Sequence, residues 1–77
     1  MKELREQIDK IDGEIFRLFG ERMEVVRQIA LYKKANGLPV HDPVREREKL
    51  AKIDCPYEQK LCETLMELSR EYQEGVL

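Results

Sequence analysis

Apolar side chains recur every three or four residues along the first half of the chain, which is the spacing of an amphipathic helix. This apolar stripe consists of Leu4, Ile8, Ile11, Ile15, Leu18, Val25 and Ile29. It predicts one helix from about Glu3 to Ala35, and the stripe continues through Gly13 and Gly20 although each glycine costs ~1 kcal/mol relative to alanine. Asn36 and Gly37 then end the helix, because both residues favour the left-handed conformation of a helix cap.

Two shorter helices are predicted in the second half. Asp42 and Pro43 suit the first positions of a helix, which we expect to run from Pro43 to about Ile53. A third helix is expected from Pro56 or Tyr57 to Glu74, with Gly75 as its cap. One face of that helix carries Leu61, Leu65, Leu68 and Tyr72. No segment has the alternating pattern of a strand, so the sequence predicts an all-α fold with three helices in one domain, residues 1–77.

The length of the first helix predicts the oligomeric state. About 33 residues at 1.5 Å per residue give a helix of ~50 Å. A compact chain of this size has a diameter of roughly 30 Å. The helix would therefore protrude with its apolar stripe in water, and a second copy of the chain is the simplest cover. We expect a homodimer.

Composition excludes several classes of protein. The chain has 14 basic and 16 acidic residues with the two signs interspersed, which is unlike the basic stripe of a nucleic-acid-binding protein. It has no long apolar run and no signal-peptide pattern, so we expect neither membrane insertion nor export. Cys55 and Cys62 are then expected to be reduced thiols of a cytoplasmic protein. One histidine, His41, is too few for a zinc site, and we expect no metal and no cofactor.

Two cations lie where apolar residues are expected. At 100° per residue, Arg22 points along the stripe of the first helix, and Lys33 returns to nearly the same direction. An unpaired charge in an apolar seam is costly. One interpretation is an ion pair with Glu46, Glu67 or an acid of a partner chain, or exposure of the charged ends alone. The other is a binding site for an anion, such as a carboxylate ligand.

The other two helices carry polar residues on apolar faces. Glu46 shares a face with Leu50 and Ile53, and a buried carboxylate needs a cation or a hydroxyl donor. The opposite face of that helix, Arg45, Lys49 and Lys52, is expected to be in solvent. In the third helix one face contains Cys62, Met66, Ser69 and Gln73. The simplest interpretation is that Ser69 and Gln73 satisfy each other or a backbone carbonyl.

Taken together, these segments resemble the all-helical chorismate mutase family. The resemblance rests on L-R-E-Q-I-D-K-I-D from Leu4 to Asp12, E-R-M at 21–23, the spacing to Lys33, D-P-V-R-E at 42–46 and E-L-S-R-E-Y-Q at 67–73. It covers nearly the whole chain, although the segment between Glu46 and Ser69 is several residues shorter than in typical members. The family implies an intertwined dimer with two equivalent active sites.

The resemblance also implies a role for each site residue. Arg5 of one chain and Arg22 of the other would bind the two carboxylates of chorismate, assisted by Arg45 and Ser69. Lys33 and Gln73 would donate to the ether oxygen. Glu46 and the backbone at Asp42 would bind the ring hydroxyl. The implied reaction is the [3,3] rearrangement of chorismate to prephenate, which needs no cofactor.

Two other functions stay open at this point. An isochorismate-pyruvate lyase would use similar cations around a related dianion. A helical dimerisation module without catalytic activity would instead pair the cations of the seam with carboxylates and bind no ligand.

Overall fold

A computed structural model describes residues 1–76 and contains three helices, α1 (Lys2–Ala35), α2 (Pro43–Ala51) and α3 (Pro56–Val76). No strand occurs within these residues. The predicted all-α fold with three helices is therefore confirmed. Residue 77, the last of the expected domain, lies outside the described residues.

Helix α1 is continuous and ends where the sequence predicts. Its helical path runs through Gly13 and Gly20 without interruption. At its end Gly37 has a φ of 64°, the left-handed conformation that glycine adopts without strain. The Leu38 N–H donates to the Lys33 carbonyl at 2.9 Å, and the Gly37 N–H to the Lys34 carbonyl at 3.4 Å. This pair of bonds is a Schellman motif, which satisfies carbonyl groups that the helix leaves free.

Helix α2 begins as predicted and ends earlier than predicted. The Asp42 carboxylate accepts a hydrogen bond from the Arg45 N–H at 3.1 Å, and Pro43 takes the first helical position. The expected end near Ile53 is wrong, because the helix stops at Ala51. The N–H groups of Lys52 and Ile53 bond carbonyls three residues back. This tighter winding marks the last turn of the helix.

Helix α3 begins at Pro56 and does not stop at Gly75. The Gln59 amide donates to the Ile53 carbonyl at 2.6 Å, which ties the start of α3 to the preceding connection. The expected cap at Gly75 is wrong, because the helix continues through this residue to Val76. Glycine permits a left-handed cap but does not impose one.

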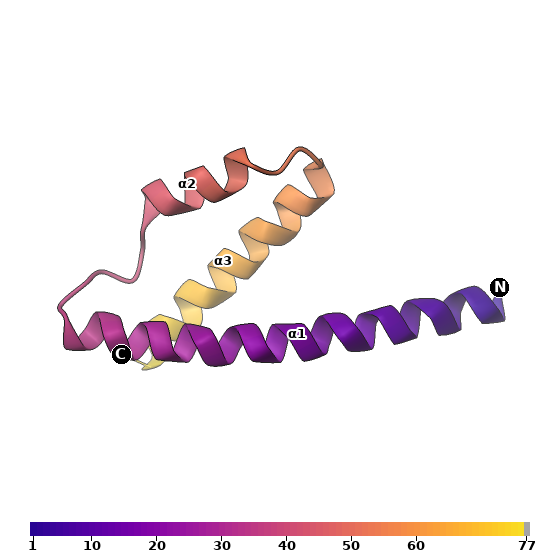
Figure 1. The fold of residues 1–77 in the computed structure, drawn as a ribbon, viewed down its shortest axis with the longest axis horizontal. Helices are drawn as coiled ribbons and strands as arrows, with labels where there is room; N and C mark the ends of the chain where they lie inside the picture. Colours follow the sequence, from indigo (N-terminus) through magenta and orange to yellow (C-terminus); the bar gives the residue numbers. More distant parts are fainter. Residues whose placement is uncertain (77) are drawn as a thin grey trace.

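The three helices leave half of α1 without a partner. Helix α3 packs against the C-terminal half of α1 on one side and against α2 on the other, while the N-terminal half of α1 projects alone (Figure 1). The extents are 51 × 25 × 15 Å and the radius of gyration is 15.3 Å. A compact chain of this length would have a radius of gyration of about 11–12 Å. The single chain is therefore markedly elongated.

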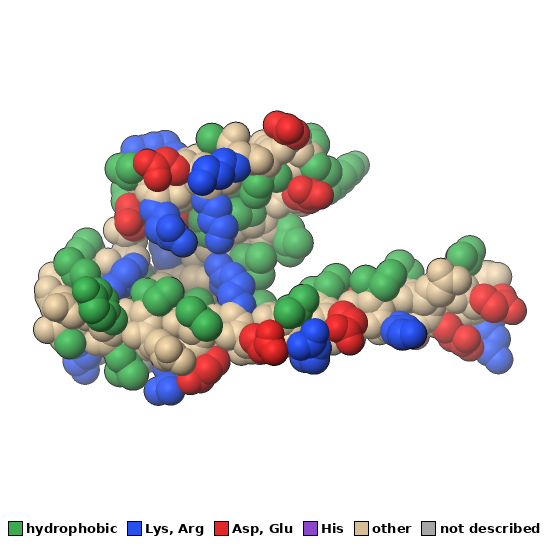
Figure 2. Space-filling view, in the orientation of Figure 1, with side chains coloured by type: hydrophobic (Ala, Val, Ile, Leu, Met, Phe, Trp, Pro, Cys, Tyr) green, Lys and Arg blue, Asp and Glu red, His purple; other side chains and the backbone are tan. Residues whose placement is uncertain are grey.

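Little apolar surface is buried within one chain. The buried apolar residues are Val26 and Ala30 of α1 with Cys62 and Met66 of α3. The apolar stripe of α1 remains exposed, as Ile8 at 55% illustrates, and Figure 2 shows these side chains along one edge of the projecting helix. Leu61 of α3 is also 54% exposed. Both apolar faces that the sequence places on α1 and α3 therefore lie uncovered in the single chain.

Candidate functional site: a cation-lined cavity between the helices

A cavity of about 200 Å³ lies between the three helices and is lined from all of them. In Figure 2 the blue side chains of lysine and arginine gather at this hollow, above the C-terminal half of α1. The predicted site residues in its wall are Arg22, Lys33, Asp42, Arg45, Glu46, Ser69 and Gln73. The fold thus brings together every residue of the predicted site except Arg5.

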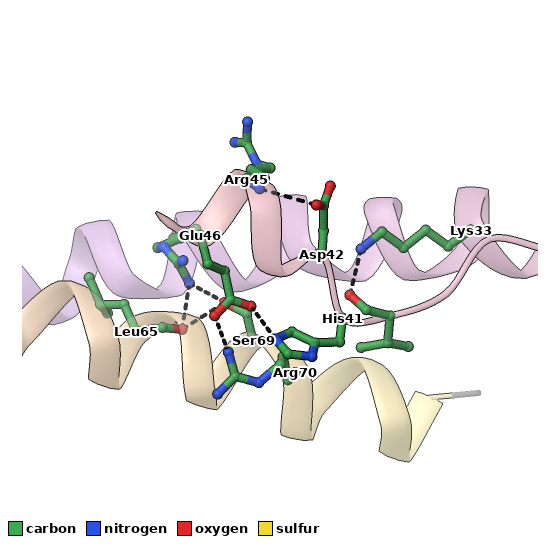
Figure 3. A network of polar contacts seen from close by, with 10 residues as sticks. Lys33, His41, Asp42, Arg45, Glu46, Leu65, Ser69 and Arg70 are labelled. Atoms are coloured by element: carbon green, nitrogen blue, oxygen red, sulfur yellow. Dashed lines mark hydrogen bonds and ion pairs between the residues drawn. The ribbon is translucent and has the colours of Figure 1, made fainter. Parts of the chain in front are cut away.

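Arg22 reaches from α1 to α3 and meets neutral groups there. Its guanidinium donates to the Ser69 hydroxyl at 2.5 Å and to the Leu65 carbonyl at 3.3 Å. Ser69 in turn donates to the Leu65 carbonyl at 2.8 Å (Figure 3). The expectation that Ser69 bonds a backbone carbonyl is confirmed, and the same hydroxyl also holds the arginine at the cavity wall.

Lys33 lies two residues before the end of α1, and its side chain turns toward the connection that follows the helix. Its ammonium group donates to the Val40 carbonyl at 2.8 Å. Val40 directly precedes the loop residues that start α2, so this bond holds the connection over the cavity. Two of the three N–H donors of the ammonium group stay free for another acceptor.

Of the two interpretations left open for the cations of the seam, an ion pair within one chain is not found among the described residues. Neither Arg22 nor Lys33 forms a salt bridge with a carboxylate of residues 1–76. Glu46 pairs with Arg70 at 2.5 Å and lies 3.4 Å from the His41 ring nitrogen. The distance between α1 and α2 explains this outcome, because the cavity separates Glu46 from the cations of α1, whereas α3 lies directly against α2.

Gln73 is buried and incompletely satisfied. The residue is only 6% exposed, and its Oε1 has no hydrogen-bond partner among the described residues. Leaving such a group without a partner costs about 1–3 kcal/mol. The expectation that Ser69 and Gln73 satisfy each other is wrong for Gln73. Because Gln73 lines the cavity, a ligand there could supply the missing contact.

Helix α2 has the exposed and half-buried faces that the sequence predicts, and it also contributes cations to the cavity. Arg45 and Lys49 are exposed as expected, whereas Glu46 is half-buried. The two cations nevertheless line the cavity together with Asp42 and Glu46. These positions recur at i, i+3, i+4 and i+7 and form one helical stripe.

Two charged residues of the cavity wall, Lys49 and Arg70, are not among the predicted site residues. A signal for Arg70 exists in the sequence, because it follows Met66 by four residues and precedes Gln73 by three, which places it beside the buried face of α3. Lys49 could be found only from its spacing of four residues after Arg45. Neither signal distinguishes a cavity residue from a solvated one.

Arg5 lies far from the cavity of its own chain. It is on the projecting half of α1, exposed beside Leu4 and Ile8. Along a continuous helix, Arg5 and Arg22 are about 25 Å apart at 1.5 Å per residue. Arg5 therefore cannot join this cavity within one chain.

The charges around the cavity favour an anionic ligand. Its carboxylates, Asp42 and Glu46, are outnumbered by Arg22, Lys33, Arg45, Lys49 and Arg70. Asp42 caps its own helix and Glu46 has Arg70, so several cations lack a counter-charge. In residues 1–76 no group of acidic, cysteine or histidine side chains could hold a metal ion. No helix there is long and apolar enough to cross a membrane.

Residues 4–74 match the family model of chorismate mutase type II. The chain belongs to this family.

Three curated relatives are similar to part of this chain. A bifunctional chorismate mutase/prephenate dehydratase of Aquifex aeolicus is 49% identical over 69% of this chain and 15% of its own length. A T-protein of Haemophilus influenzae is 44% identical over 60% of this chain and 12% of its own. A chorismate mutase of Methanocaldococcus jannaschii is 38% identical over 61% of this chain and 48% of its own. The matched segments therefore span about half or less of each relative.

Proposed function

We propose that this domain converts chorismate into prephenate in the cavity between its helices. One observation carries the proposal: in the same cavity, Arg22 and Lys33 have no carboxylate partner within residues 1–76, and Oε1 of the buried Gln73 has no hydrogen-bond partner there. A ligand with two carboxylates would pair with these cations, and an oxygen acceptor on it would suit Gln73 with its amide turned so that Nε2 donates. The name of the Methanocaldococcus jannaschii relative supports chorismate as this ligand.

The reaction is an intramolecular rearrangement, in which the ether C–O bond breaks while a C–C bond forms at the ring. No proton is transferred and no covalent intermediate with the protein forms. Catalysis then rests on holding the flexible side arm of chorismate over its ring. Because the arm loses its conformational freedom on binding, the activation barrier of the bound substrate is lower. Arg22, assisted by Arg45, would hold one carboxylate by charge-assisted hydrogen bonds, with Ser69 fixing the Arg22 guanidinium.

The ether oxygen gains negative charge as its bond breaks. Hydrogen-bond donors aimed at that oxygen stabilise the transition state more than the ground state. Lys33 of α1 and Gln73 of α3 both lie in the cavity wall, and we assign this role to them. The amide of Gln73 has a donor and an acceptor end, so rotation of the amide brings its Nε2 toward the ligand.

The ring hydroxyl of chorismate needs an acceptor on the other side of the cavity. Glu46 is 22% exposed at its side chain and lies in the cavity wall. We assign the hydroxyl to Glu46 and to the backbone at Asp42, where α2 begins. This assignment separates the cavity into a cationic side for the carboxylates and the ether oxygen and an acidic corner for the hydroxyl.

The active form is proposed to be an intertwined homodimer. The exposed apolar stripe of α1 and the exposed leucines of α3 would be covered by a second copy. The projecting half of α1 would then carry Arg5 into the partner's cavity, where it binds the second carboxylate. This arrangement also explains why Arg5 lies so far from the other site residues in one chain.

A direct assay tests the proposal. Purified protein is mixed with chorismate, and the loss of chorismate and the appearance of prephenate are followed, with isochorismate in a parallel reaction. Lys33→Ala is the test variant and Lys34→Ala, an exposed neighbour on α1, is its control. We expect turnover of chorismate by the wild type and by Lys34→Ala only. Pyruvate release from isochorismate without prephenate formation would favour a lyase, and no turnover of either compound would contradict the proposal.

A further inference from the structure

The carboxylate of Glu46 is held by the protein itself before any ligand binds. Arg70 of α3 donates to Glu46 Oε1 at 2.5 Å, and the His41 ring nitrogen lies 3.4 Å from Oε2 (Figure 3). The Arg70 and Glu46 side chains are 30% and 22% exposed, whereas His41 is 57% exposed. Arg70 is therefore the better-shielded partner of Glu46, and it is not used by the reaction described above.

This contact fixes where the carboxylate of Glu46 can point. A glutamate side chain has several freely rotating bonds, and ordering it during catalysis would cost entropy. Arg70 reaches it from a different helix, so the position of Glu46 is set from α3 as well as from α2. Each carboxylate oxygen has further acceptor capacity, which leaves Glu46 able to accept a hydroxyl while Arg70 holds it.

The contact also changes the charge that a ligand meets. An uncompensated carboxylate in a small cavity would repel a dianion, and this repulsion is screened less there than in water. The guanidinium of Arg70 offsets that charge and lines the same cavity. Glu46 can then serve as a hydrogen-bond acceptor with little repulsion of the carboxylate bound by Arg22 and Arg45.

We propose that Arg70 is a positioning residue of the site, which orients Glu46 toward the ring hydroxyl of the substrate and offsets its negative charge. The inference rests on the proposed conversion of chorismate. The other interpretation is that Arg70 and Glu46 only fasten α2 to α3, which would make the contact important for folding and irrelevant to the hydroxyl.

The two interpretations differ for a substrate that lacks the ring hydroxyl. The variants are Arg70→Met, Arg70→Lys, Glu46→Gln and the double variant of Arg70→Met with Glu46→Gln. Arg17→Met is the control, because it also removes contacts between arginine and glutamate, with Glu14 and Glu21 of α1, away from the cavity. Values of kcat and KM are measured with chorismate and with the chorismate analogue lacking the ring hydroxyl, alongside helicity and Tm.

We expect Arg70→Met to lower kcat/KM for chorismate by about 10–100-fold, the loss typical of a misplaced contact group. The value for the analogue should fall much less, because the uncompensated Glu46 charge repels both dianions but only chorismate loses a contact to its ring hydroxyl. Arg70→Lys keeps the positive charge and should recover part of the loss. The double variant should be no worse than Glu46→Gln alone, because Arg70 acts through Glu46. Arg17→Met should resemble the wild type with both compounds.

Several outcomes would overturn the inference. An equal loss of kcat/KM for chorismate and for the analogue would mean that the contact only supports the fold. The same conclusion would follow if the losses of Arg70→Met and Glu46→Gln multiplied in the double variant. If Arg70→Met does not fold, Arg70→Lys decides the question. In Arg70→Lys the ratio of kcat/KM for chorismate to kcat/KM for the analogue must then be lower than in the wild type. If the wild type turns over chorismate and Arg70→Met does so equally well, this inference alone is rejected. If the wild type does not turn over chorismate, the proposed function and this inference are both rejected.

Discussion

The guanidinium of Arg22 on α1 donates to the hydroxyl of Ser69 on α3 at 2.5 Å, and no carboxylate of residues 1–76 pairs with it. A partly buried cation is thus held in place by neutral groups, which keeps its charge available. An ion pair of Arg22 inside the protein would have to break before an anion could bind. The arrangement is therefore suited to an anionic ligand and poorly explained by structural stabilisation alone.

Substitution of Lys33 should separate activity from folding. Lys33→Ala removes a donor proposed to act at the ether oxygen, and we expect kcat/KM for chorismate to fall by ~10²–10³, as for other donors to developing negative charge. The variant also loses the bond to the Val40 carbonyl, which should cost about 0.5–1.5 kcal/mol of stability. Circular dichroism and thermal unfolding check the fold. A loss of helicity that parallels the loss of activity would contradict a catalytic role.

Substitution of Gln73 by glutamate should make the activity depend on pH. An amide donates at any pH, whereas a carboxyl group donates only when protonated. The rate of Gln73→Glu is therefore expected to be highest in acid and to fall as the pH rises through the pKa of the new carboxyl group. Gln28→Glu, at an exposed position of α1, is the control and should keep the wild-type profile. A flat pH-rate profile for Gln73→Glu would show that this side chain does not face the breaking bond.

Lys49 and Lys52 provide a matched pair on α2. Lys49 lines the cavity, while Lys52 follows the helix and is exposed outside it. Because Lys49 has no carboxylate partner in residues 1–76, it should contribute ~0.2–1 kcal/mol to binding a dianion. Lys49→Ala should raise KM by roughly 1.4–5-fold and weaken its dependence on salt. The same KM in Lys49→Ala and Lys52→Ala would place Lys49 outside the binding site.

The sequence predicts those parts of the fold that depend on neighbouring residues. Gly37 and Asp42 mark helix ends through local geometry and local hydrogen bonds, so the end of α1 and the start of α2 are predicted correctly. Gly75 shows the limit of this reasoning, because glycine at a permissive position does not end α3. The face shared by Ser69 and Gln73 is also predicted, since it follows from the period of one helix.

Relations between helices could not be predicted from periodicity. The contact of Arg70 with Glu46, and the place of the exposed Arg45 and Lys49 in the cavity wall, depend on how α2 packs against α3. That packing also depends on the connection at residues 52–55, which the pattern within α2 does not encode. The apolar stripe of α1 predicts that a partner covers it. The stripe is exposed in the single chain, and the homodimer stays a prediction.

The central claim is a chorismate site built from the cavity of one chain and Arg5 of another, and mixing two inactive variants tests it most directly. Arg5→Ala and Arg22→Ala, each expected to be nearly inactive, are unfolded together at equal concentration and refolded. About half of the twofold dimers should then be mixed. In a mixed dimer one cavity receives both substitutions and the other receives neither.

The account predicts that the refolded mixture recovers about a quarter of the wild-type activity, because roughly half of the cavities in half of the dimers are intact. The two variants refolded separately are the controls and should stay inactive. Chain exchange is verified independently with one variant carrying an affinity tag. No recovery of activity despite verified exchange would contradict the account, because Arg5 and Arg22 would then not come from different chains to serve one cavity.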